Sequence, residues 1–215
     1  PAPRRRADDG RARGTMFASM GGMVPECECA HVAHEPRLVV LTGGPGAGKT
    51  AVLEVVRRHF CRHVVVLPEA AGILFAGGFP RRRSLPARTA AQRAIFRVQR
   101  ELERMTIEEG TAAVILCDRG TLDGLAYWPP EAPPFLAEVG VTRADELARY
   151  AAVIHLRTPG DGEGYDQSNP LRHESAAEAA AIDERIVDAW AGHPARVEVE
   201  ATADFLHKLE RAIGV

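Results

Sequence analysis

Eight consecutive residues most constrain what this chain is able to fold into: Gly43 to Thr50 read Gly-Gly-Pro-Gly-Ala-Gly-Lys-Thr. Their spacing fits the pattern G-x-x-x-x-G-K-[ST] of a phosphate-binding loop. In such a loop backbone N–H groups face the phosphates, Lys49 reaches the β- and γ-phosphate oxygens, and the Thr50 hydroxyl completes the shell of a Mg²⁺ ion. The sequence therefore predicts a nucleoside triphosphate ligand, bound by Gly43, Gly44, Pro45, Gly46, Ala47, Gly48, Lys49 and Thr50.

The residues on either side of the loop predict the strand and the helix that it has to join. The apolar run from Leu38 to Leu41 is typical of a parallel strand buried on both faces. After the loop, apolar residues recur at helical spacing from Val52 to Phe60. A helix beginning there directs its free N–H groups and the positive end of its dipole at the phosphates. This order of strand, loop and helix argues against the alternative, a glycine-rich turn in an unrelated domain.

Size and charge limit the classes of ligand and partner. With 215 residues, of which 46% are hydrophobic and 26% charged, the chain is long enough for one substantial core. The net charge of −2 gives no electrostatic case for a nucleic acid or an anionic membrane as partner. No apolar run has the length of a membrane span and none resembles a signal peptide, so we expect cytoplasmic residence and a small-molecule ligand.

The first part of the chain differs from the rest. Residues 1–36 lack hydrophobic periodicity, which predicts a disordered or weakly ordered extension before a nucleotide-binding domain at 37–215. Cys27, Cys29, His31 and His34 form a C-x-C-x-H-x-x-H cluster whose side chains are of the types that surround Zn²⁺. Against a zinc site, structural zinc usually draws its ligands from two separated segments, and the cluster lies in one.

From Leu38 onward, apolar runs alternate with helical patterns, which is typical of a doubly wound α/β domain with a parallel five-stranded sheet flanked by helices. The strands are expected at 38–41, 64–67, 112–117, 151–156 and 197–199. Two apolar stripes predict long helices, one through Ala91, Ile95, Val98, Leu102 and Met105, the other through Ala179, Ile182, Ile186, Val187 and Trp190.

Smaller signals mark helix starts and the end of the fold. Ser175 with Glu178 predicts a capping box at the start of the second long helix, and Thr142 with Asp145 predicts the start of a short one. Phe205, Leu206, Leu209 and Ile213 predict a final helix.

Charged residues directly follow two of the expected strands. Ligands of open α/β sheets bind beyond the carboxyl ends of the strands, so Glu69, Asp118 and Arg119 are candidate site residues. Asp118 is expected to hold Mg²⁺ together with Thr50, the alternative being a helix N-cap. If the two strands are neighbours, Glu69 lies beside Asp118 and is placed to accept a proton from an acceptor hydroxyl. The alternative is that Glu69 lies in the first turn of a helix, where its negative charge interacts favourably with the helix dipole. Arg119 suits the neutralisation of a phosphate.

A polar segment at 157–174 is expected to form a lid over the site. Arg172 is the first choice for an arginine that closes on the γ-phosphate, and Arg157 is the second. The run Arg81 to Arg83 is either a solvated loop or a contact for an anionic acceptor. Tyr127 and Trp128 either stack on a substrate ring or pack within the protein.

Several segments together carry a resemblance to a known family. These are Leu41 to Thr50, Leu67-Pro68-Glu69-Ala70-Ala71, Gln92-Arg93-Ala94-Ile95, Cys117-Asp118-Arg119-Gly120, Asn169-Pro170-Leu171-Arg172-His173-Glu174, Ile182-Asp183 and Trp190-Ala191-Gly192-His193-Pro194. In them the chain resembles the NadR-like group of small P-loop proteins, also described as AAA-domain ATPases, to which the insect TRPL translocation defect protein is similar. The resemblance covers residues 37 to 215.

The resemblance implies a kinase-like P-loop NTPase fold, with the third strand beside the loop strand, rather than a ring-forming AAA motor. It also implies that Glu69 is the base and that Asp118 and Arg119 are the phosphate-binding pair of a nucleoside-kinase-like site. Phosphorylation of nicotinamide riboside, as in the NadR kinase domain, is then one analogy for the reaction.

Two functions follow as expectations. The first is a small-molecule kinase that uses Mg²⁺ and ATP, with GTP as the alternative donor, and with Lys49, Glu69, Asp118, Arg119 and Arg172 as catalytic residues. The second is a nucleotide-dependent regulatory or binding protein with slow NTPase activity. The sequence fixes neither the acceptor nor the oligomeric state.

Overall fold

A computed structural model describes residues 34–159, 175–201 and 212 of the chain. Within them, five parallel strands form one sheet in the order β2-β3-β1-β4-β5. The strand that precedes the phosphate loop, β1 (Arg37–Thr42), lies at the centre, between β3 (Val114–Asp118) and β4 (Tyr150–Leu156). The predicted five-stranded parallel sheet and the position of the third strand beside the loop strand are therefore confirmed.

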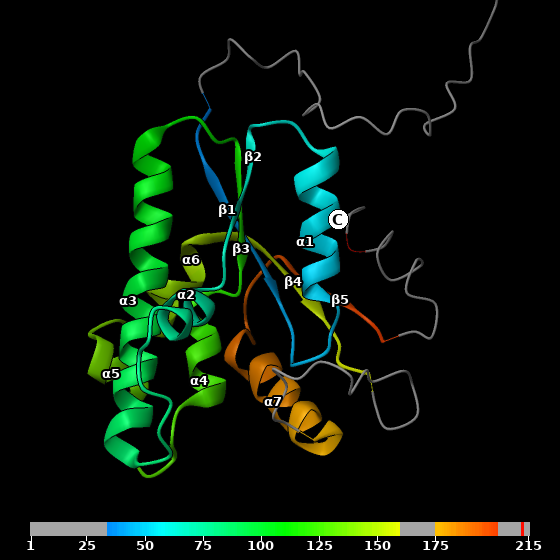
Figure 1. The fold of residues 1–215 in the computed structure, drawn as a ribbon. Coiled ribbons are helices and arrows are strands. Elements are labelled where there is room, and N and C mark those ends of the chain that lie inside the picture. Colours follow the sequence, from blue (N-terminus) through cyan, green and yellow to red (C-terminus); the bar gives the residue numbers. More distant parts are fainter. Residues whose placement is uncertain (1–33, 160–174, 202–211, 213–215) are drawn as a thin grey trace, which may run out of the picture.

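The remaining elements alternate with these strands along the chain (Figure 1). The outer strands are β2 (Val64–Leu67) and β5 (Arg196–Val199). The helices are α1 (Lys49–His59), α2 (Ala70–Ala76), α3 (Leu85–Glu109), α4 (Gly124–Tyr127), α5 (Phe135–Val139), α6 (Arg143–Ala148) and α7 (Ala176–Ala189), with a 3₁₀ turn, η1, at Thr121–Asp123.

Helices cover both faces of the sheet, and each face has its own hydrophobic core. On one face, Val52, Leu53 and Val56 of α1 pack on the sheet with Leu41 and Ile154. On the other face, α3, α4 and α7 pack on the sheet; the buried residues there include Val40, Ile115, Leu122, Ala126, Val153, Ile186 and Trp190. Because successive side chains of a strand point to opposite faces, the continuous apolar runs of β1, β3 and β4 supply both cores.

The two predicted helix starts are confirmed in detail. At the start of α7, the Ser175 side chain accepts a hydrogen bond from the Glu178 N–H, while the Glu178 side chain accepts one from the Ser175 N–H. At the start of α6, the Thr142 hydroxyl accepts a hydrogen bond from the Asp145 N–H. These bonds satisfy N–H groups that a helix terminus otherwise leaves unpaired.

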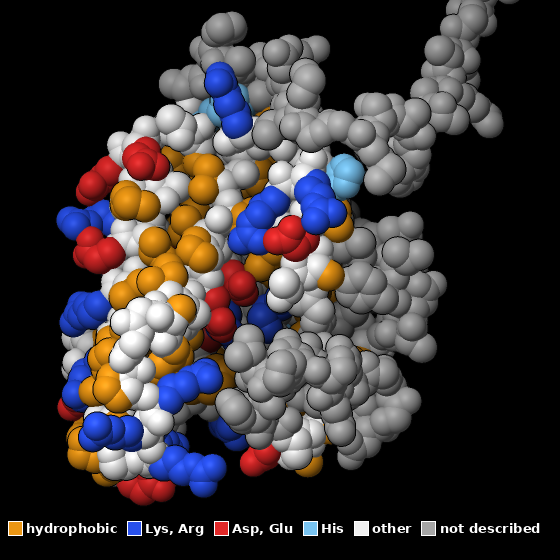
Figure 2. Space-filling model, in the orientation of Figure 1, with side chains coloured by type: hydrophobic (Ala, Val, Ile, Leu, Met, Phe, Trp, Pro, Cys, Tyr) orange, Lys and Arg blue, Asp and Glu red, His pale blue; other side chains and the backbone are white. Residues whose placement is uncertain are grey.

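The buried face of the long helix α3 is only in part the one that its apolar stripe predicts: Ala91 of the stripe is buried and Leu102 packs against the core. Met105 of that stripe is 50% exposed, while Phe96, Gln99 and Glu103 are buried. Hydrophobic side chains gather on the surface over α3 as a result (Figure 2). The apolar stripe missed Gln99 and Glu103 because they are polar: Gln99 donates to Glu103 on the same helix, and Glu103 is compensated by Arg149 and Tyr150 from a distant part of the chain.

Some expectations concern residues outside those that the structure describes. They are the extension at 1–33 with Cys27, Cys29 and His31, the part of the predicted lid at 160–174 that includes Arg172, and the final helix through Phe205, Leu206, Leu209 and Ile213. Among the described residues, no helix combines the length and the hydrophobicity needed to cross a membrane.

Candidate active site

The phosphate loop joins β1 to α1 as predicted. Gly43, Gly46 and Gly48 have φ angles of 137°, 81° and 92°, a region of backbone conformation that glycine adopts without strain. The Lys49 ammonium donates hydrogen bonds to the carbonyl oxygens of Gly43 at 2.8 Å and Gly44 at 3.0 Å. Burial, assisted by the positive charge of Arg119, lowers the pKa of Lys49 to about 7. Lys49 is therefore held against the loop and binds its proton less firmly than an exposed lysine.

Gly44 ties the loop to α7. Its N–H donates to Oδ1 of Asp183 at 2.8 Å. A Cβ atom on Gly44 would lie 2.4 Å from the Thr158 hydroxyl oxygen and 2.9 Å from the Ala179 carbonyl oxygen, both too close for a methyl group. Gly44 is not among the glycines with positive φ, so its backbone conformation does not require glycine. Glycine is needed here because a side chain would collide with the atoms that approach it.

Asp183 joins the loop to the end of β4. Besides the Gly44 N–H, its carboxylate contacts Nε2 of His155 at 2.9 Å and accepts from the Thr158 N–H at 3.3 Å. Only 2% of Asp183 is exposed. Burial opposes its charge, but the hydrogen bonds from His155 and Gly44 outweigh burial and hold the pKa of Asp183 below its usual value. An ionised carboxylate therefore fixes the position of the loop relative to α7.

Glu69 and Asp118 are neighbours at the carboxyl edge of the sheet. Strands β2 and β3 pair with Leu67 opposite Cys117, so the carboxylates that follow lie close together. Asp118 is the last residue of β3 and not the N-cap of a helix. Burial, opposed by the charge of Lys49 and assisted by that of Glu69, raises the pKa of Asp118. Glu69 is the N-cap residue of α2, and 39% of its side chain is exposed, so it is accessible to a ligand.

Arg119 lies between the expected base and the phosphate loop. Its guanidinium donates to the Glu69 carboxylate at 2.7 Å, to the Gly43 carbonyl at 3.2 Å and to the Asp123 carboxylate at 3.2 Å. Burial opposes its charge, but Tyr127, Asp123 and Glu69 outweigh burial and raise the pKa of Arg119. Its backbone φ of 73° is in the left-handed region, which is uncommon for residues other than glycine. Arg119 is therefore a fixed positive charge at the centre of the site.

Asp123 is a site residue that the sequence reasoning did not single out. It is 3% exposed and accepts hydrogen bonds from the Thr42 hydroxyl at 2.6 Å and from the Trp190 indole N–H at 2.6 Å, in addition to Arg119. It thereby connects the end of β1, the end of α7 and the segment after β3. Its place five residues after Asp118, beyond the same strand end, was the available signal.

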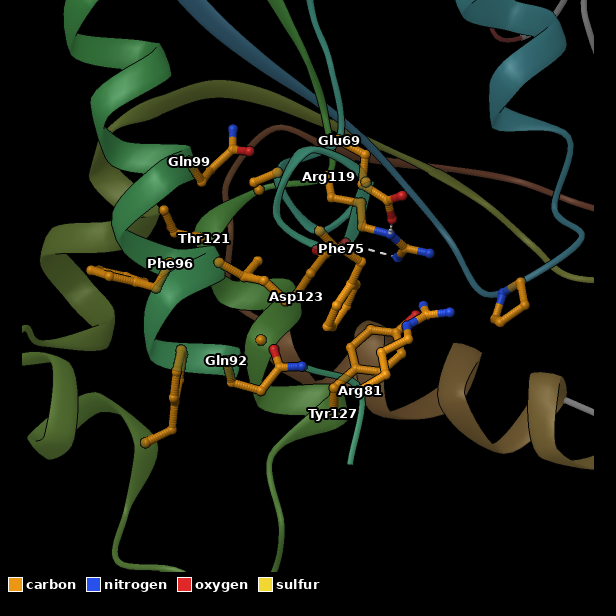
Figure 3. A pocket seen from close by; sticks show the side chains of 18 residues that line it. Glu69, Phe75, Arg81, Gln92, Phe96, Gln99, Arg119, Thr121, Asp123 and Tyr127 are labelled. Carbon is orange, nitrogen blue, oxygen red and sulfur yellow. Dashed lines mark hydrogen bonds and ion pairs between the residues drawn. The ribbon is translucent and has the colours of Figure 1, made fainter. Parts of the chain in front are cut away.

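A cavity of about 400 Å³ lies beside the phosphate loop (Figure 3). At one end it is lined by Pro45, Glu69, Arg119 and Asp123. The rest of its wall is formed largely by aromatic and amide side chains from α2, α3, α4 and α5: Phe75, Gln92, Phe96, Gln99, Tyr127 and Phe135. The cavity thus joins a charged end at the loop to an apolar end with a few polar groups, as small-molecule sites commonly do.

One of these amides has a fixed orientation. Gln99 donates its side-chain N–H to the Glu103 carboxylate at 2.8 Å. Glu103 is fully buried and paired with Arg149, and it also accepts from the Tyr150 hydroxyl at 2.8 Å. Because a carboxylate only accepts hydrogen bonds, the amide oxygen of Gln99 is turned away from Glu103. Gln99 therefore presents a hydrogen-bond acceptor to the cavity that it lines.

Of three further candidates from the sequence, two line the cavity and one packs within the protein. Arg81 and Tyr127 line the cavity, and the guanidinium of Arg81 lies 4.3 Å from the centre of the Phe75 ring. Trp128 packs against Phe135 and donates its N–H to the Pro133 carbonyl, so it belongs to the packing of this region. Figure 3 shows both Arg81 and Tyr127 among the side chains that line the cavity.

Arg157, the second choice for a lid arginine, is engaged in ion pairs. Its guanidinium contacts the carboxylates of Asp183 and Glu184 on α7 and of Glu198 on β5. These contacts hold it against the body of the domain. Arg172, the first choice, lies outside the described residues.

The residues expected to hold Mg²⁺ have the right chemistry for it. Thr50 is exposed at the start of α1, and Asp118 ends β3 close enough to Lys49 for their charges to interact. A hydroxyl and a carboxylate are the oxygen donors that Mg²⁺ prefers, and in sites of this kind the substrate phosphates and waters supply its other ligands.

The comparisons with known proteins agree with this fold. The chain matches the model of an AAA domain over residues 38–207. A structure of NadR in complex with NAD and AMP-PNP is similar, with a TM-score of 0.55 and 15% identity over 84% of this chain and 50% of that one. A structure of NadR in complex with NR has a TM-score of 0.57 and 13% identity over 85% of this chain and 53% of that one. At these identities the similarity shows the fold alone, and the chain spans about half the length of the NadR chains. No curated protein matches it.

Proposed function

We propose that this chain, which belongs to the AAA domain family, is a small-molecule kinase. It transfers the γ-phosphate of ATP or GTP to an acceptor hydroxyl. The observation that carries this proposal is the cavity beside the phosphate loop, with the Glu69 carboxylate in its wall. A protein that only hydrolyses a nucleotide needs no second enclosed site next to the phosphates. We place the reaction in the cytoplasm.

The phosphate donor is bound by the loop from Gly43 to Thr50. The N–H groups of the loop face its phosphates, and Lys49 exchanges its hydrogen bonds with loop carbonyls for contacts with phosphate oxygens. Thr50 and Asp118 hold Mg²⁺, which neutralises charge on the β- and γ-phosphates when it is bound.

Glu69 acts as the general base. Its carboxylate takes the proton of the acceptor hydroxyl as the hydroxyl oxygen forms a bond to the γ-phosphorus, and the bond from that phosphorus to the bridging oxygen of the β-phosphate breaks. The nucleoside diphosphate leaves with that oxygen. The hydrogen bond from Arg119 orients the Glu69 carboxylate, and the charge of Arg119 offsets charge on the group in transfer. Arg172 is proposed to close on the γ-phosphate.

The cavity wall supports an acceptor with a flat ring. Phe75 and Tyr127 offer ring faces, and the Gln99 amide oxygen offers a hydrogen-bond acceptor for an N–H or O–H group. A ring that carries such a donor fits these walls, with its hydroxyl directed at Glu69. The NadR structure in complex with NR makes nicotinamide riboside a suitable first compound to test.

The experiment is a transfer assay with the purified chain, Mg²⁺, ATP labelled in the γ-phosphate, and a panel of hydroxyl compounds that begins with nicotinamide riboside. We expect label in one acceptor in a 1:1 ratio with the nucleoside diphosphate formed. Nucleotide binding accompanied only by slow release of inorganic phosphate, with every acceptor unlabelled, would instead support a regulatory nucleotide-binding protein.

A further inference from the structure

A network of buried polar side chains lies behind the wall of the acceptor cavity, between α3 and β4. At its centre is Glu103, which is fully buried. One oxygen of its carboxylate accepts hydrogen bonds from the Gln99 amide at 2.8 Å and from the Tyr150 hydroxyl at 2.8 Å, and the other oxygen accepts from Arg149. The proposed transfer of phosphate uses neither Glu103 nor its partners Arg149 and Tyr150.

The partners of this carboxylate are held as donors. An arginine only donates hydrogen bonds. Burial, assisted by the charge of Glu103, raises the pKa of Tyr150, so its hydroxyl keeps the proton that it donates. Gln99 therefore has to face Glu103 with its N–H₂ group and the cavity with its oxygen. A charge that lies behind the cavity wall thus sets which atom of Gln99 a ligand meets.

An amide in place of the Glu103 carboxylate would reverse this orientation. Because Arg149 offers only donors, the carbonyl oxygen of the new amide has to turn toward it. The new N–H₂ group then takes the position of the oxygen that Gln99 and Tyr150 now contact. Two N–H₂ groups do not hydrogen-bond to each other, so Gln99 has to turn its oxygen toward position 103 and its N–H₂ group toward the cavity.

The hydroxyl and guanidinium groups of the network can adapt to that change. Tyr150, whose oxygen would accept from the new amide, can donate to the Thr121 hydroxyl oxygen 3.1 Å away. Thr121 in turn donates to the buried Glu146 carboxylate at 2.6 Å. Arg149 keeps its ion pair with Glu146 at 3.1 Å. Gln99 therefore has two orientations in which the network is satisfied, and the charge at position 103 decides between them.

We propose that Glu103 is a positioning residue that selects the acceptor: through Gln99 it makes the cavity specific for a ring that carries an N–H₂ group. This selection rests on the proposed function, because the cavity has to be the acceptor site. A carbonyl in place of the N–H₂ group would bring two oxygens together with no proton between them. Sites built to hydrogen-bond a donor on the substrate discriminate strongly against the analogue that lacks it.

Two pairs of ribosides test this selection, with affinities measured by calorimetry on the full chain saturated with Mg²⁺ and a non-hydrolysable ATP analogue. Nicotinamide riboside is paired with 3-acetylpyridine riboside, in which a methyl group replaces the N–H₂ of the amide. Adenosine is paired with purine riboside, which lacks the amino group. We expect at least one pair to bind, and its N–H₂ member to bind about tenfold more tightly, because its partner leaves the Gln99 oxygen without a donor.

Glu103→Gln should change the ratio of the affinities as well as their size. 3-Acetylpyridine riboside should bind about fivefold more tightly to Glu103→Gln than to the unaltered chain, because Gln99 then donates to its carbonyl oxygen. Its affinity should come close to that of nicotinamide riboside, whose amide carbonyl accepts the same hydrogen bond. The advantage of adenosine over purine riboside should likewise be lost. A general loss of packing or stability does not produce a gain in affinity for one compound.

Tyr150→Phe and Glu101→Gln are the matched controls. Tyr150→Phe removes another hydrogen bond of Glu103 but leaves the charge that orients Gln99. Glu101 pairs with Arg104, and both side chains are exposed on α3. Both variants should keep the preference of the unaltered chain. Gln99→Met, which removes the amide, should abolish the preference and decides the question if Glu103→Gln does not fold.

Selection by Glu103 and phosphate transfer itself fail in different ways. If a pair binds but its two members bind equally to the unaltered chain, or if Glu103→Gln keeps the preference, Glu103 does not select the acceptor, although the cavity still binds one. An acceptor found in the transfer assay that carries no N–H₂ group would also overturn the selection. If none of the four ribosides binds and the transfer assay labels no acceptor, the cavity is not an acceptor site and the proposed function fails as well.

Discussion

The Glu69 carboxylate accepts a hydrogen bond of 2.7 Å from Nε of Arg119, and the same guanidinium reaches the carbonyl oxygen of Gly43 in the phosphate loop. One fixed positive charge therefore lies between the expected base and the expected site of the phosphates. This relation orients the Glu69 carboxylate before any acceptor binds. Replacing Glu69 should therefore impair phosphate transfer while leaving phosphate binding intact.

Glu69→Gln should lower phosphoryl transfer at least a hundredfold while ATP affinity changes less than twofold, because the amide keeps the shape of the side chain but cannot take a proton. Transfer to the acceptor and binding of a fluorescent ATP analogue measure the two effects. Glu54→Gln, on the exposed surface of α1, is the control. Unchanged turnover in Glu69→Gln would mean that another group is the base.

Asp123→Asn should destabilise the protein by about 2–4 kcal/mol, because it removes the charge that pairs with buried Arg119 and introduces an N–H₂ group among donors. Urea unfolding followed by circular dichroism measures the change. Asp145→Asn, at the exposed start of α6, is the control and should cost less than about 1 kcal/mol. A loss at Asp123 no larger than at Asp145 would show that the hydrogen bonds of Asp123 contribute little.

Local sequence patterns were sufficient for the elements and for the layout of the phosphate loop. The runs at 38–41 and 64–67 became β1 and β2 because an unbroken apolar run is stable only where both faces are covered. The neighbouring positions of Glu69 and Asp118 also followed, since parallel strands end at one edge of a sheet.

What local patterns missed was pairing across long sequence separations. Asp183 meets Gly44 from 139 residues away, and Asp123 meets Thr42 from 81 residues away. Glu103 reads as a solvated helix residue until Arg149 and Tyr150 come within reach of it in the fold. A buried charge is identified by its partners, and the sequence does not show which distant residues those are.

Lys49 predicts a pH dependence of nucleotide binding. The pKa of Lys49 is lowered to about 7 in the nucleotide-free protein, and the phosphates of a nucleotide favour the charged amine and so raise it. Between these two pKa values binding takes up a proton, so ATP affinity should fall as pH rises from about 7.5 to 9.5, by at most tenfold per unit. Calorimetry in buffers of different ionisation enthalpy measures the proton uptake.

Lys49→Met is the control for that experiment, because it lacks the titrating amine. Its ATP affinity should be weak but nearly independent of pH over the same range. Equal pH dependence in Lys49→Met and the unaltered chain would assign the proton to another group.

Gln99→Met should raise the KM for the acceptor by about threefold to tenfold, because the thioether has the length of the amide but offers no comparable hydrogen-bond acceptor to the cavity. The KM for ATP should stay the same, since Gln99 lies in the wall of the cavity and not in the phosphate loop. Steady-state kinetics with the acceptor that the transfer assay identifies measure both constants. An unchanged KM for the acceptor would exclude a hydrogen bond from the acceptor to Gln99.

Gly44→Ala should weaken nucleotide binding at least tenfold. The added methyl group would lie 2.4 Å from the Thr158 oxygen and 2.9 Å from the Ala179 carbonyl oxygen, so the loop has to move away from α7 and lose the hydrogen bond to Asp183. Titration with Mg²⁺ and ATP measures the affinity, and urea unfolding should show a loss of about 1–3 kcal/mol. Gly72→Ala is the control for stability, because the nearest atom to its added methyl group lies at 3.7 Å, an ordinary contact distance. If Gly44→Ala binds ATP as tightly as the unaltered chain, contact with α7 does not set the shape of the phosphate loop.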